Sequence, residues 1–294
     1  MDTEPMDFLR PTSWPDALAA KAEHPDALPI AGGTDVMVEL NFDQRRPPEL
    51  LDLTGVAELN QWDAVDGRVR LGAGVSYSRV ITELGDRLPG LAMASRTVGS
   101  PQIRNRGTVG GNLGSASPAG DAHPALLAAE TEVEVASVHG TRLIPIGDFF
   151  TGVKRHALEP DELIAAVWIT PPSGPQQFSK IGTRNAMVIA VCAFGLALHP
   201  DRRTVGTGIG SAAPTPIRAG EAERFLADAL TDAGLWDSPA ELPEPVVDGF
   251  AGRVASAAAP IDDVRGSAAY RRHALSVMAR RTLGWAWTDY RKAA

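Results

Sequence analysis

The sequence predicts an α+β fold in two domains. Its 294 residues are enough to build two hydrophobic cores. Three prolines within residues 171–175 cannot continue a helix or occupy a central strand, so we place the boundary there, between domains at residues 1–172 and 176–294. Beyond this boundary strand patterns come first and helical patterns follow, an order that favours α+β over a doubly wound sheet.

The first domain is expected to mix helices with short strands. Thr12 or Ser13 can cap a helix that continues to Ala22, and an apolar strand follows at residues 28–31. Further helices are expected at residues 78–84 and 124–130.

Two hairpins are expected in the same domain. Residues 64–71 form the first, because Asp66-Gly67 supplies the positive φ angles of a tight turn. The second joins residues 132–138 to 141–146 through a turn at His139-Gly140.

The second domain is expected to begin with strands at residues 178–181, 187–198 and 204–210. A helix then starts at Thr215-Pro216 and runs to Leu230. Residues 238–246 form a proline-rich connector, and a last helix covers 267–283.

Charge and cysteine content exclude several classes of function. The net charge of −8 argues against nucleic acid or an anionic membrane as a partner. The single cysteine, Cys192, excludes an internal disulfide, a cysteine-ligated zinc site and an iron–sulfur cluster in this chain, and its apolar surroundings predict a buried thiol. Residues 1–10 lack the apolar core of a secretory signal, so a cytoplasmic location is the expectation.

Two glycine-rich stretches carry the main functional signal: Ala31-Gly32-Gly33-Thr34-Asp35 and Thr108-Val109-Gly110-Gly111-Asn112. Loops without side chains allow backbone N–H groups to surround an anion such as a diphosphate. One such loop is weak evidence, because it is equally typical of a strand–helix turn with Asp35 as the cap. Two of them predict a dinucleotide held from two sides.

Each of three charged residues allows two interpretations. Asp121 either caps the helix after it or accepts hydrogen bonds from ribityl or ribose hydroxyls. Lys180 and Arg184 are either a solvated pair or, at the domain interface, cations that stabilise negative charge on a bound cofactor.

Other motifs point away from catalysis by a triad or a metal. Gly72-Ala73-Gly74 and residues 206–210 do not fit the G-x-G-x-x-G pattern and are expected to be strand-end turns. The six histidines are scattered singly, and most are expected to face solvent.

Together, several ordered segments resemble the FAD-binding subunit of the molybdenum hydroxylases, the xanthine dehydrogenase and carbon monoxide dehydrogenase family. The segments that carry this resemblance are residues 29–36, 102–107, 108–112, 117–121, 213–219 and 263–272. The resemblance covers nearly the whole chain. It implies a two-part FAD-binding domain of the PCMH/vanillyl-alcohol-oxidase type, followed by a smaller CO-dehydrogenase-flavoprotein-like C-terminal domain.

The resemblance also implies which residues hold FAD. The diphosphate would lie against the two glycine stretches, Asp121 would hold ribityl or ribose hydroxyls, Ile164 would pack near the adenine or the ring system, and Lys180 would approach the isoalloxazine. Val98 stands where some relatives have an aromatic residue. The implied cofactor-binding residues are Pro29, Ile30, Ala31, Gly32, Gly33, Thr34, Asp35, Val36, Val98, Thr108, Val109, Gly110, Gly111, Asn112, Asp121, Ile164 and Lys180. It implies no catalytic residue and no metal ligand in this chain.

The function implied by the resemblance is electron transfer. A molybdenum-cofactor large subunit would hydroxylate the substrate, a 2Fe-2S small subunit would carry the electrons, and FAD on this chain would pass them to NAD, quinone or oxygen. The complex would be a hetero-oligomer, with a dimer of heterotrimers as one arrangement. A self-contained FAD-dependent oxidase or dehydrogenase of the vanillyl-alcohol-oxidase type, and a cofactor-free scaffold, remain as alternatives.

Overall fold

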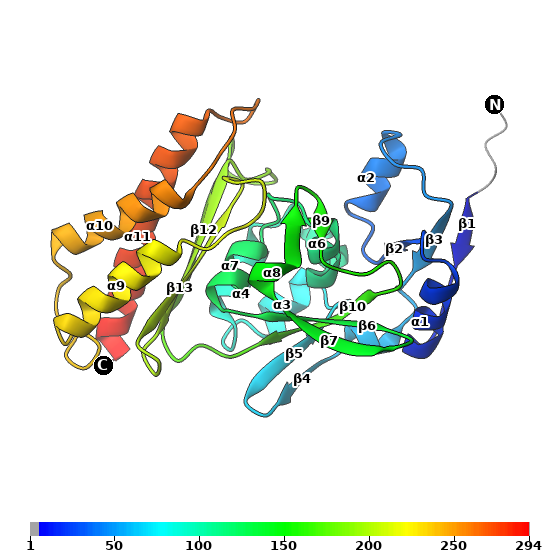
Figure 1. The fold of residues 1–294 in the computed structure, drawn as a ribbon, viewed down its shortest axis with the longest axis horizontal. Coiled ribbons are helices and arrows are strands. Elements are labelled where there is room, and N and C mark those ends of the chain that lie inside the picture. The colour runs from blue at the N-terminus through cyan, green and yellow to red at the C-terminus, as the bar shows by residue number, and fades with distance from the viewer. Residues whose placement is uncertain (1–5, 294) are drawn as a thin grey trace.

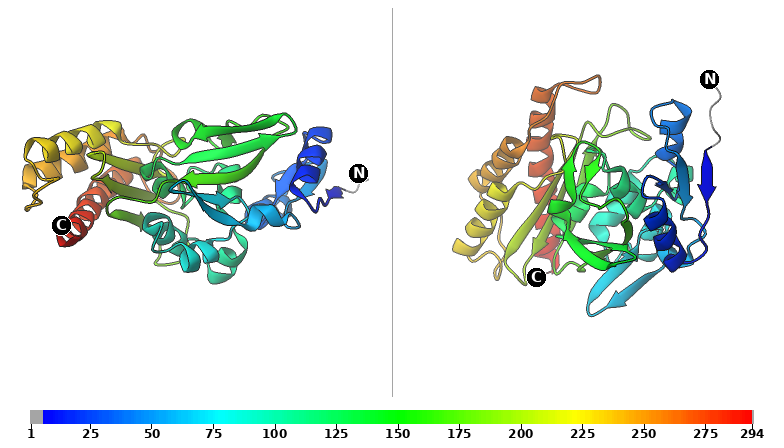
Figure 2. Two further views of the ribbon diagram at one scale, coloured as in Figure 1. Left: turned by 90° about the horizontal axis from the view of Figure 1, so that it is seen from below. Right: turned by 45° about the vertical axis from the view of Figure 1, so that its right-hand side comes forward.

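A computed structural model describes residues 6–293 (Figure 1). The predicted domain limits at residues 1 and 294 lie outside the described residues. Within these residues the strands form four sheets, and helices pack against them in an α+β arrangement, as the sequence predicts. Figure 2 shows a small N-terminal sheet at one end of the molecule and three long C-terminal helices at the other.

The N-terminal sheet is parallel and has the strand order β1-β3-β2. Its strands are β1 (Asp7–Leu9), β2 (Leu28–Ile30) and β3 (Glu49–Asp52). Helix α1 (Trp14–Glu23) connects β1 to β2, and the Ser13 hydroxyl caps it by accepting from Asp16 N at 3.2 Å. Strand β2 leads through the first glycine stretch into helix α2 (Val36–Asn41), and η1 (Ala57–Asn60) follows β3.

A five-stranded antiparallel sheet forms the centre of the molecule, in the order β4-β5-β10-β6-β7. Its strands are β4 (Trp62–Val65), β5 (Arg68–Gly72), β6 (Glu132–Ser137), β7 (Gly140–Pro145) and β10 (Leu163–Ile169). The first hairpin turns at Asp66-Gly67 with φ of 50° and 77°, as predicted. The second turns one residue earlier than predicted, because Ser137 pairs with Gly140 and the glycine (φ 139°) opens the second strand.

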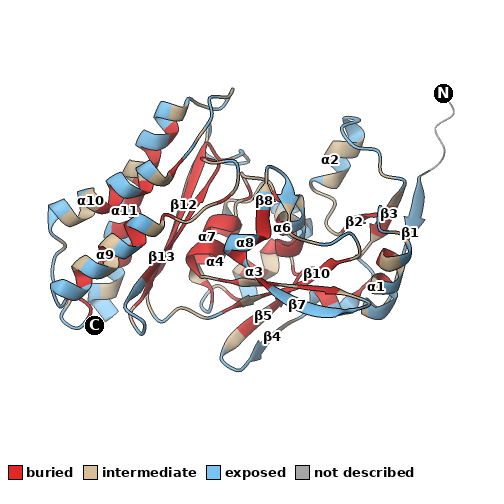
Figure 3. Cartoon of the chain, viewed as in Figure 1, coloured by how far each residue is buried: buried red, intermediate tan, exposed pale blue. Residues whose placement is uncertain are grey.

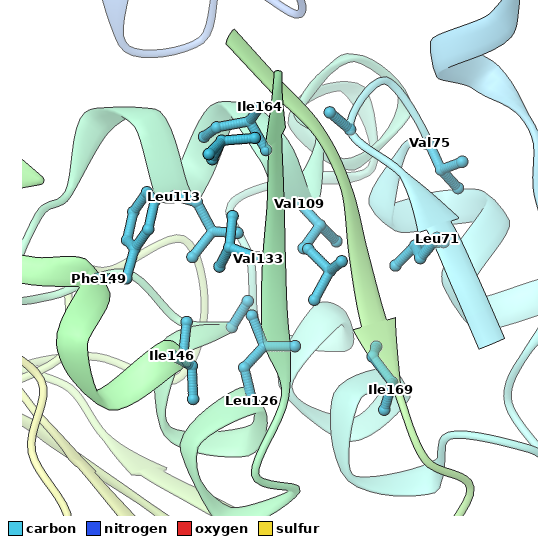
Figure 4. Close-up of a cluster of buried hydrophobic side chains, with 14 of the residues drawn as sticks. Leu71, Val75, Val109, Leu113, Leu126, Val133, Ile146, Phe149, Ile164 and Ile169 are labelled. Carbon is cyan, nitrogen blue, oxygen red and sulfur yellow. The ribbon is translucent and has the colours of Figure 1, made fainter. Parts of the chain in front are cut away.

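Short helices pack against the central sheet and enclose a hydrophobic core. Val109, Leu113, Leu126 and Ile164 belong to this core and are labelled in Figure 4. They are α3 (Tyr77–Glu83), α4 (Pro89–Arg96), α5 (Pro101–Arg106), α6 (Val109–Ser115), α7 (His123–Ala128) and α8 (Ile146–Phe149). A two-stranded hairpin, β8 (Phe150–Gly152) with β9 (Arg155–His156), follows α8.

The second glycine stretch is the first turn of helix α6 and not a loop, so that prediction is wrong. The Thr108 hydroxyl accepts from Gly111 N at 2.9 Å, which is the N-cap geometry that starts a helix. Helical propensity alone disfavours two adjacent glycines, and the cap together with the burial of Val109 and Leu113 overcomes that cost.

The C-terminal sheet is antiparallel, in the order β11-β12-β13. Its strands are β11 (Gln176–Ile181), β12 (Cys192–His199) and β13 (Thr204–Gly210). Helices α9 (Gly220–Asp232), α10 (Glu244–Ala257) and α11 (Ala268–Ala293) cover one face, and α4 and α7 lie on the other. All eight residues of β12 are consequently buried (Figure 3), and Cys192 is the buried thiol that was predicted.

Glycines let the backbone of α7 lie directly on this sheet. A Cβ added at Gly206 would stand 2.0 Å from Ala128 O, and one at Gly208 would stand 2.1 Å from Pro124 O. The prediction of a strand-end turn at residues 206–210 is therefore wrong, because these residues belong to β13, whose bounds are those of the strand predicted at residues 204–210. Of the six histidines, His139 and His273 are exposed, whereas His123 and His199 are buried and the other two are half-buried, so the expectation that most face solvent is wrong as well.

Several element boundaries in the second domain differ from the predicted ones. Residues 187–191 precede β12, and Met187 has φ of 50°, which no strand accommodates. Helix α9 starts at Gly220 because Ile217 is still paired with Ile209 in a β-bridge. The connector ends at Pro243, where the unpredicted helix α10 begins, and α11 continues ten residues beyond the predicted end.

Replacing Gly208 by alanine should destabilise the protein by about 2 kcal/mol or more, because the methyl group must displace the α7 backbone. Urea unfolding followed by circular dichroism measures the change. Gly252→Ala is the control: this helical position is open, so alanine should stabilise by about 1 kcal/mol. Equal stability of wild type and Gly208→Ala would contradict the direct backbone contact.

Candidate functional site

A cavity of about 870 Å³ lies between the two glycine stretches. Its wall includes the first stretch, the turn at residues 98–100, the start of α6, the segment 117–121 and the loop 187–189. These parts come from both sides of the predicted domain boundary. The cavity therefore brings together segments that are far apart in the sequence.

The first glycine stretch bends sharply after β2. Gly33 has φ of 74°, a conformation that favours glycine. A Cβ at Gly32 would stand 1.9 Å from Arg106 O, so this glycine is needed for contact with the end of α5. Asp35 occupies the N-cap position of α2, as predicted, but its side chain makes no capping hydrogen bond. Burial raises the pKa of the Asp35 carboxyl, and the nearby Glu39 raises it further.

The second stretch also depends on close packing. Gly110 N donates to Ala73 O at 3.1 Å, and a Cβ at Gly110 would stand 2.4 Å from the Ala73 Cβ. Glycines 32 and 110 are therefore required for the fold around the cavity. Gly111 and Gly114 have more space and also line the cavity.

Four polar side-chain atoms of the cavity wall are buried and have no hydrogen-bond partner within the described residues. They are Tyr77 Oη, Asn112 Oδ1, Asp121 Oδ1 and His156 Nδ1. An unsatisfied buried polar atom costs about 1–3 kcal/mol, so such groups are normally paired. Their collection in one cavity fits a ligand that carries several hydroxyl and N–H groups.

Asp121 and Lys180 form an ion pair with 2.8 Å between Oδ2 and Nζ. The Lys180 ammonium also donates to Thr97 O at 3.1 Å, and its side chain is only 7% exposed, so the reading of Lys180 as a solvated residue is wrong. Burial raises the pKa of Asp121 to about 6, against the opposing effect of Lys180. The helix-cap reading of Asp121 is also wrong, because the N-cap of α7 is Ala122.

Arg184 does not join this pair. Its guanidinium donates to the carbonyls of Ala186 and Met187 in its own loop. Its side chain is exposed, in agreement with the interpretation of Arg184 as a solvated residue.

The structure brings most of the predicted site residues to the cavity wall. Those that line it are Pro29, Ala31, Gly32, Gly33, Thr34, Asp35, Val36, Val98, Thr108, Gly110, Gly111, Asn112, Asp121 and Ile164. Ile30 and Val109 are buried beneath it, and Lys180 reaches it through Asp121.

Sequence reasoning missed Tyr77, His156 and the loop 187–189. Tyr77 is 3% exposed, and its buried hydroxyl has no hydrogen-bond partner among residues 6–293, which no local pattern reveals. A charged part of the cavity wall was also not predicted from the sequence. There Lys154 Nζ and Glu39 Oε1 lie 2.7 Å apart, and this ion pair joins the β8–β9 hairpin to α2.

Two negative observations apply to residues 6–293. No three histidine, cysteine, aspartate or glutamate side chains among them are grouped as metal ligands would be. Their helices are all too short or too polar to span a membrane.

Comparison with protein families gives two matches in tandem. Residues 4–172 match the FAD binding domain in molybdopterin dehydrogenase, and residues 177–286 match the CO dehydrogenase flavoprotein C-terminal domain.

Individual relatives and solved structures point to the same two-domain family. The chain is 30% identical over 288 residues to a xanthine dehydrogenase FAD-binding subunit of Escherichia coli O157:H7, with 94% of each chain covered. It is 28% identical over 289 residues to the carbon monoxide dehydrogenase medium chain of Afipia carboxidovorans, covering 94% of this chain and 95% of the relative. The structure of a Cu,Mo-CO dehydrogenase superposes with a TM-score of 0.88 at 27% identity, over 98% of this chain and 100% of the other. The chain therefore belongs to the FAD-binding medium subunits of the xanthine dehydrogenase and carbon monoxide dehydrogenase type of molybdenum hydroxylases.

Proposed function

We propose that the cavity between the two glycine stretches is the FAD site of this subunit. The observation that carries the proposal is the set of four buried, unpartnered polar atoms in its wall. FAD carries a diphosphate, ribose and ribityl hydroxyls and a flavin ring, and so offers partners for both the glycine-rich backbone and these side chains. When bound, the flavin supplies redox chemistry that protein side chains lack.

Each part of the wall suits one part of FAD. The first glycine stretch suits the diphosphate, since its backbone N–H groups can approach the anion without side chains between them. The second stretch lets the diphosphate lie close to the start of α6, although the N–H groups of Gly110 and Gly111 are already bonded to Ala73 O and Thr108 Oγ1. Asp121 Oδ1 and Asn112 Oδ1 can accept from hydroxyls, and Tyr77 can donate or accept. Ile164 and Val98 supply apolar contact, and Lys180 holds Asp121 in place.

We further propose that the domains divide at residues 1–172 and 176–294, with FAD held mainly by the first. The cavity residues support this, since most of them precede Pro171 and the loop 187–189 closes one side. Lys180 then lies on the first strand of the second domain and reaches back to the first.

In the assembled enzyme we propose that the subunit relays electrons. A 2Fe-2S small subunit would deliver electrons taken from a substrate at a molybdenum-cofactor large subunit, and NAD or another acceptor would remove them. The support is that similar proteins are named as FAD-binding subunits and medium chains of dehydrogenases. We propose a hetero-oligomer in the cytoplasm.

Tyr77→Phe should weaken FAD binding about tenfold while leaving the FAD-free protein as stable as wild type or slightly more stable. The hydroxyl has no hydrogen-bond partner in the part of the chain that the structure describes, so its removal should cost little stability until a ligand binds there. Fluorescence titration with FAD and thermal unfolding of the FAD-free protein measure the two quantities.

The matched control for this variant is Tyr290→Phe. Tyr290 Oη donates to Trp236 O at 2.7 Å, far from the cavity, so its loss should lower stability by about 1 kcal/mol without changing FAD affinity. Wild-type FAD affinity in Tyr77→Phe would refute the assignment of this hydroxyl to the ligand.

FAD affinity should rise with pH through about 6 and level off above it. The Asp121 pKa is about 6 in the FAD-free protein, and a hydroxyl donor favours the ionised carboxylate, so binding releases a proton below that pH. Asp121→Asn should remove this part of the pH dependence. Titrations between pH 5 and 8 provide the measurement, and an identical slope in both proteins would exclude Asp121 as the titrating ligand contact.

Substrate-dependent reduction of FAD on this chain should require the partner subunits. The relay proposal expects no reduction by purine or N-heterocyclic substrates when the purified FAD-loaded chain is alone, and rapid reduction in the copurified complex. Stopped-flow absorbance at the flavin band follows the reaction. Reduction of the isolated chain by an organic substrate would instead favour a self-contained flavoenzyme.

A further inference from the structure

The turn between α4 and α5 is held by two cations that come from different parts of the chain. Arg104 Nη1 lies 3.0 Å from Val98 O, 3.2 Å from Gly99 O and 3.4 Å from Arg96 O. The remaining carbonyl, Thr97 O, accepts from Lys180 Nζ at 3.1 Å. Four consecutive carbonyls, those of residues 96–99, are therefore directed toward positive charge.

The fold requires such donors at this point. Helix α4 ends at Arg96, and Thr97 N and Val98 N donate to Ala94 O and Ser95 O. The carbonyls of residues 96–99 accept no backbone N–H within the described residues, so they depend on side-chain donors. The chain then reverses through Gly99, which has φ of 40°, before Ser100 caps α5. Hydrogen bonds from a charged donor are about twice as strong as neutral ones, which suits a guanidinium to this position. Because Nη1 has two hydrogens, the bonds to Val98 and Gly99 are the principal ones.

The other side of this turn is a wall of the cavity. Val98, Gly99 and Ser100 line it, whereas Arg104 does not. Lys180 connects the same turn to a second part of the wall, since its ammonium also binds Asp121. Displacement of the turn would therefore change the cavity at residues 98–100 and, through Lys180, at Asp121.

We propose that Arg104 is a positioning residue of the redox reaction: it fixes the backbone of residues 96–99 so that Val98 and Gly99 form a closed wall beside FAD, without touching FAD itself. This inference rests on the proposed FAD site. It assigns to Arg104 a role in cofactor affinity and in shielding the cofactor from solvent.

The test compares Arg104→Met with Arg106→Met. Methionine keeps the apolar stem of Arg104 and removes the donors. Arg106 lies on the same helix, is exposed, and its side chain makes no hydrogen bond within the described residues. Each variant is titrated with FAD, and iodide quenching of bound flavin fluorescence then measures how accessible the cofactor is.

Arg104→Met should raise the Kd for FAD about tenfold, the equivalent of one charge-assisted hydrogen bond. At saturating FAD it should also raise the iodide quenching constant about twofold or more, a change that a loss of global stability would not produce. Arg104→Lys, which retains a cationic donor, should fall between wild type and Arg104→Met in both measurements. Arg106→Met should match wild type. If the methionine variant does not fold, Arg104→Gln replaces it with the same expected direction.

Wild-type Kd and quenching in Arg104→Met would overturn the proposal, as would equal losses in Arg104→Met and Arg106→Met. No recovery in Arg104→Lys would show that packing, and not donation to the carbonyls, is what matters, and would overturn it too. Failure of the FAD site itself is distinguishable, because Tyr77→Phe would then also bind FAD like wild type.

Discussion

Direct contact of backbone with backbone, through glycine, sets the geometry of this subunit. The C-terminal sheet rests on helix α7 at Gly206 and Gly208, where a methyl group would overlap a carbonyl oxygen. The cavity walls contain the same kind of close contact, since Gly32 lies on the end of α5 and Gly110 lies on Ala73. Because backbone atoms and an alanine methyl cannot change rotamer, these contacts hold the elements at a nearly fixed separation. The polar cavity can exist only because its walls are supported in this way.

This changes the meaning of the glycine-rich signal in the sequence. The pattern alone predicts space for an anion, and both stretches do line the cavity. Gly32 and Gly110, however, are needed for packing whether or not a ligand is present. Gly111 also has a structural role, because its N–H donates to the Thr108 hydroxyl that caps α6, whereas Gly33, with its positive φ, lines the cavity without such a bond.

The sequence predicted the fold class and most of the residues that gather at the cavity, because both depend on ordered local motifs. Local signals such as Ser13 and Asp66-Gly67 placed their helix and turn correctly, since capping and tight turns are decided within a few residues. The helical state of residues 109–115 was missed because burial of Val109 and Leu113 outweighs glycine propensity there. The burial of the Tyr77 hydroxyl and the pairing of Lys180 with Asp121 could not be predicted. Both depend on contacts between segments far apart in the chain, which a single sequence does not reveal.

The ion pair between Lys180 and Asp121 bears on how such subunits can be recombined. Lys180 is the fifth residue of β11, at the start of the C-terminal sheet, and it makes its contacts with Thr97 and Asp121 on the other side of the proline-rich segment. The two parts of the chain are therefore not interchangeable modules, although each has its own core. A chimera that takes its C-terminal part from a relative would need a cation at the same place on the first strand. Without it, Asp121 and the turn after α4 would each lose a partner, and a graft that folds well could still have a damaged cavity.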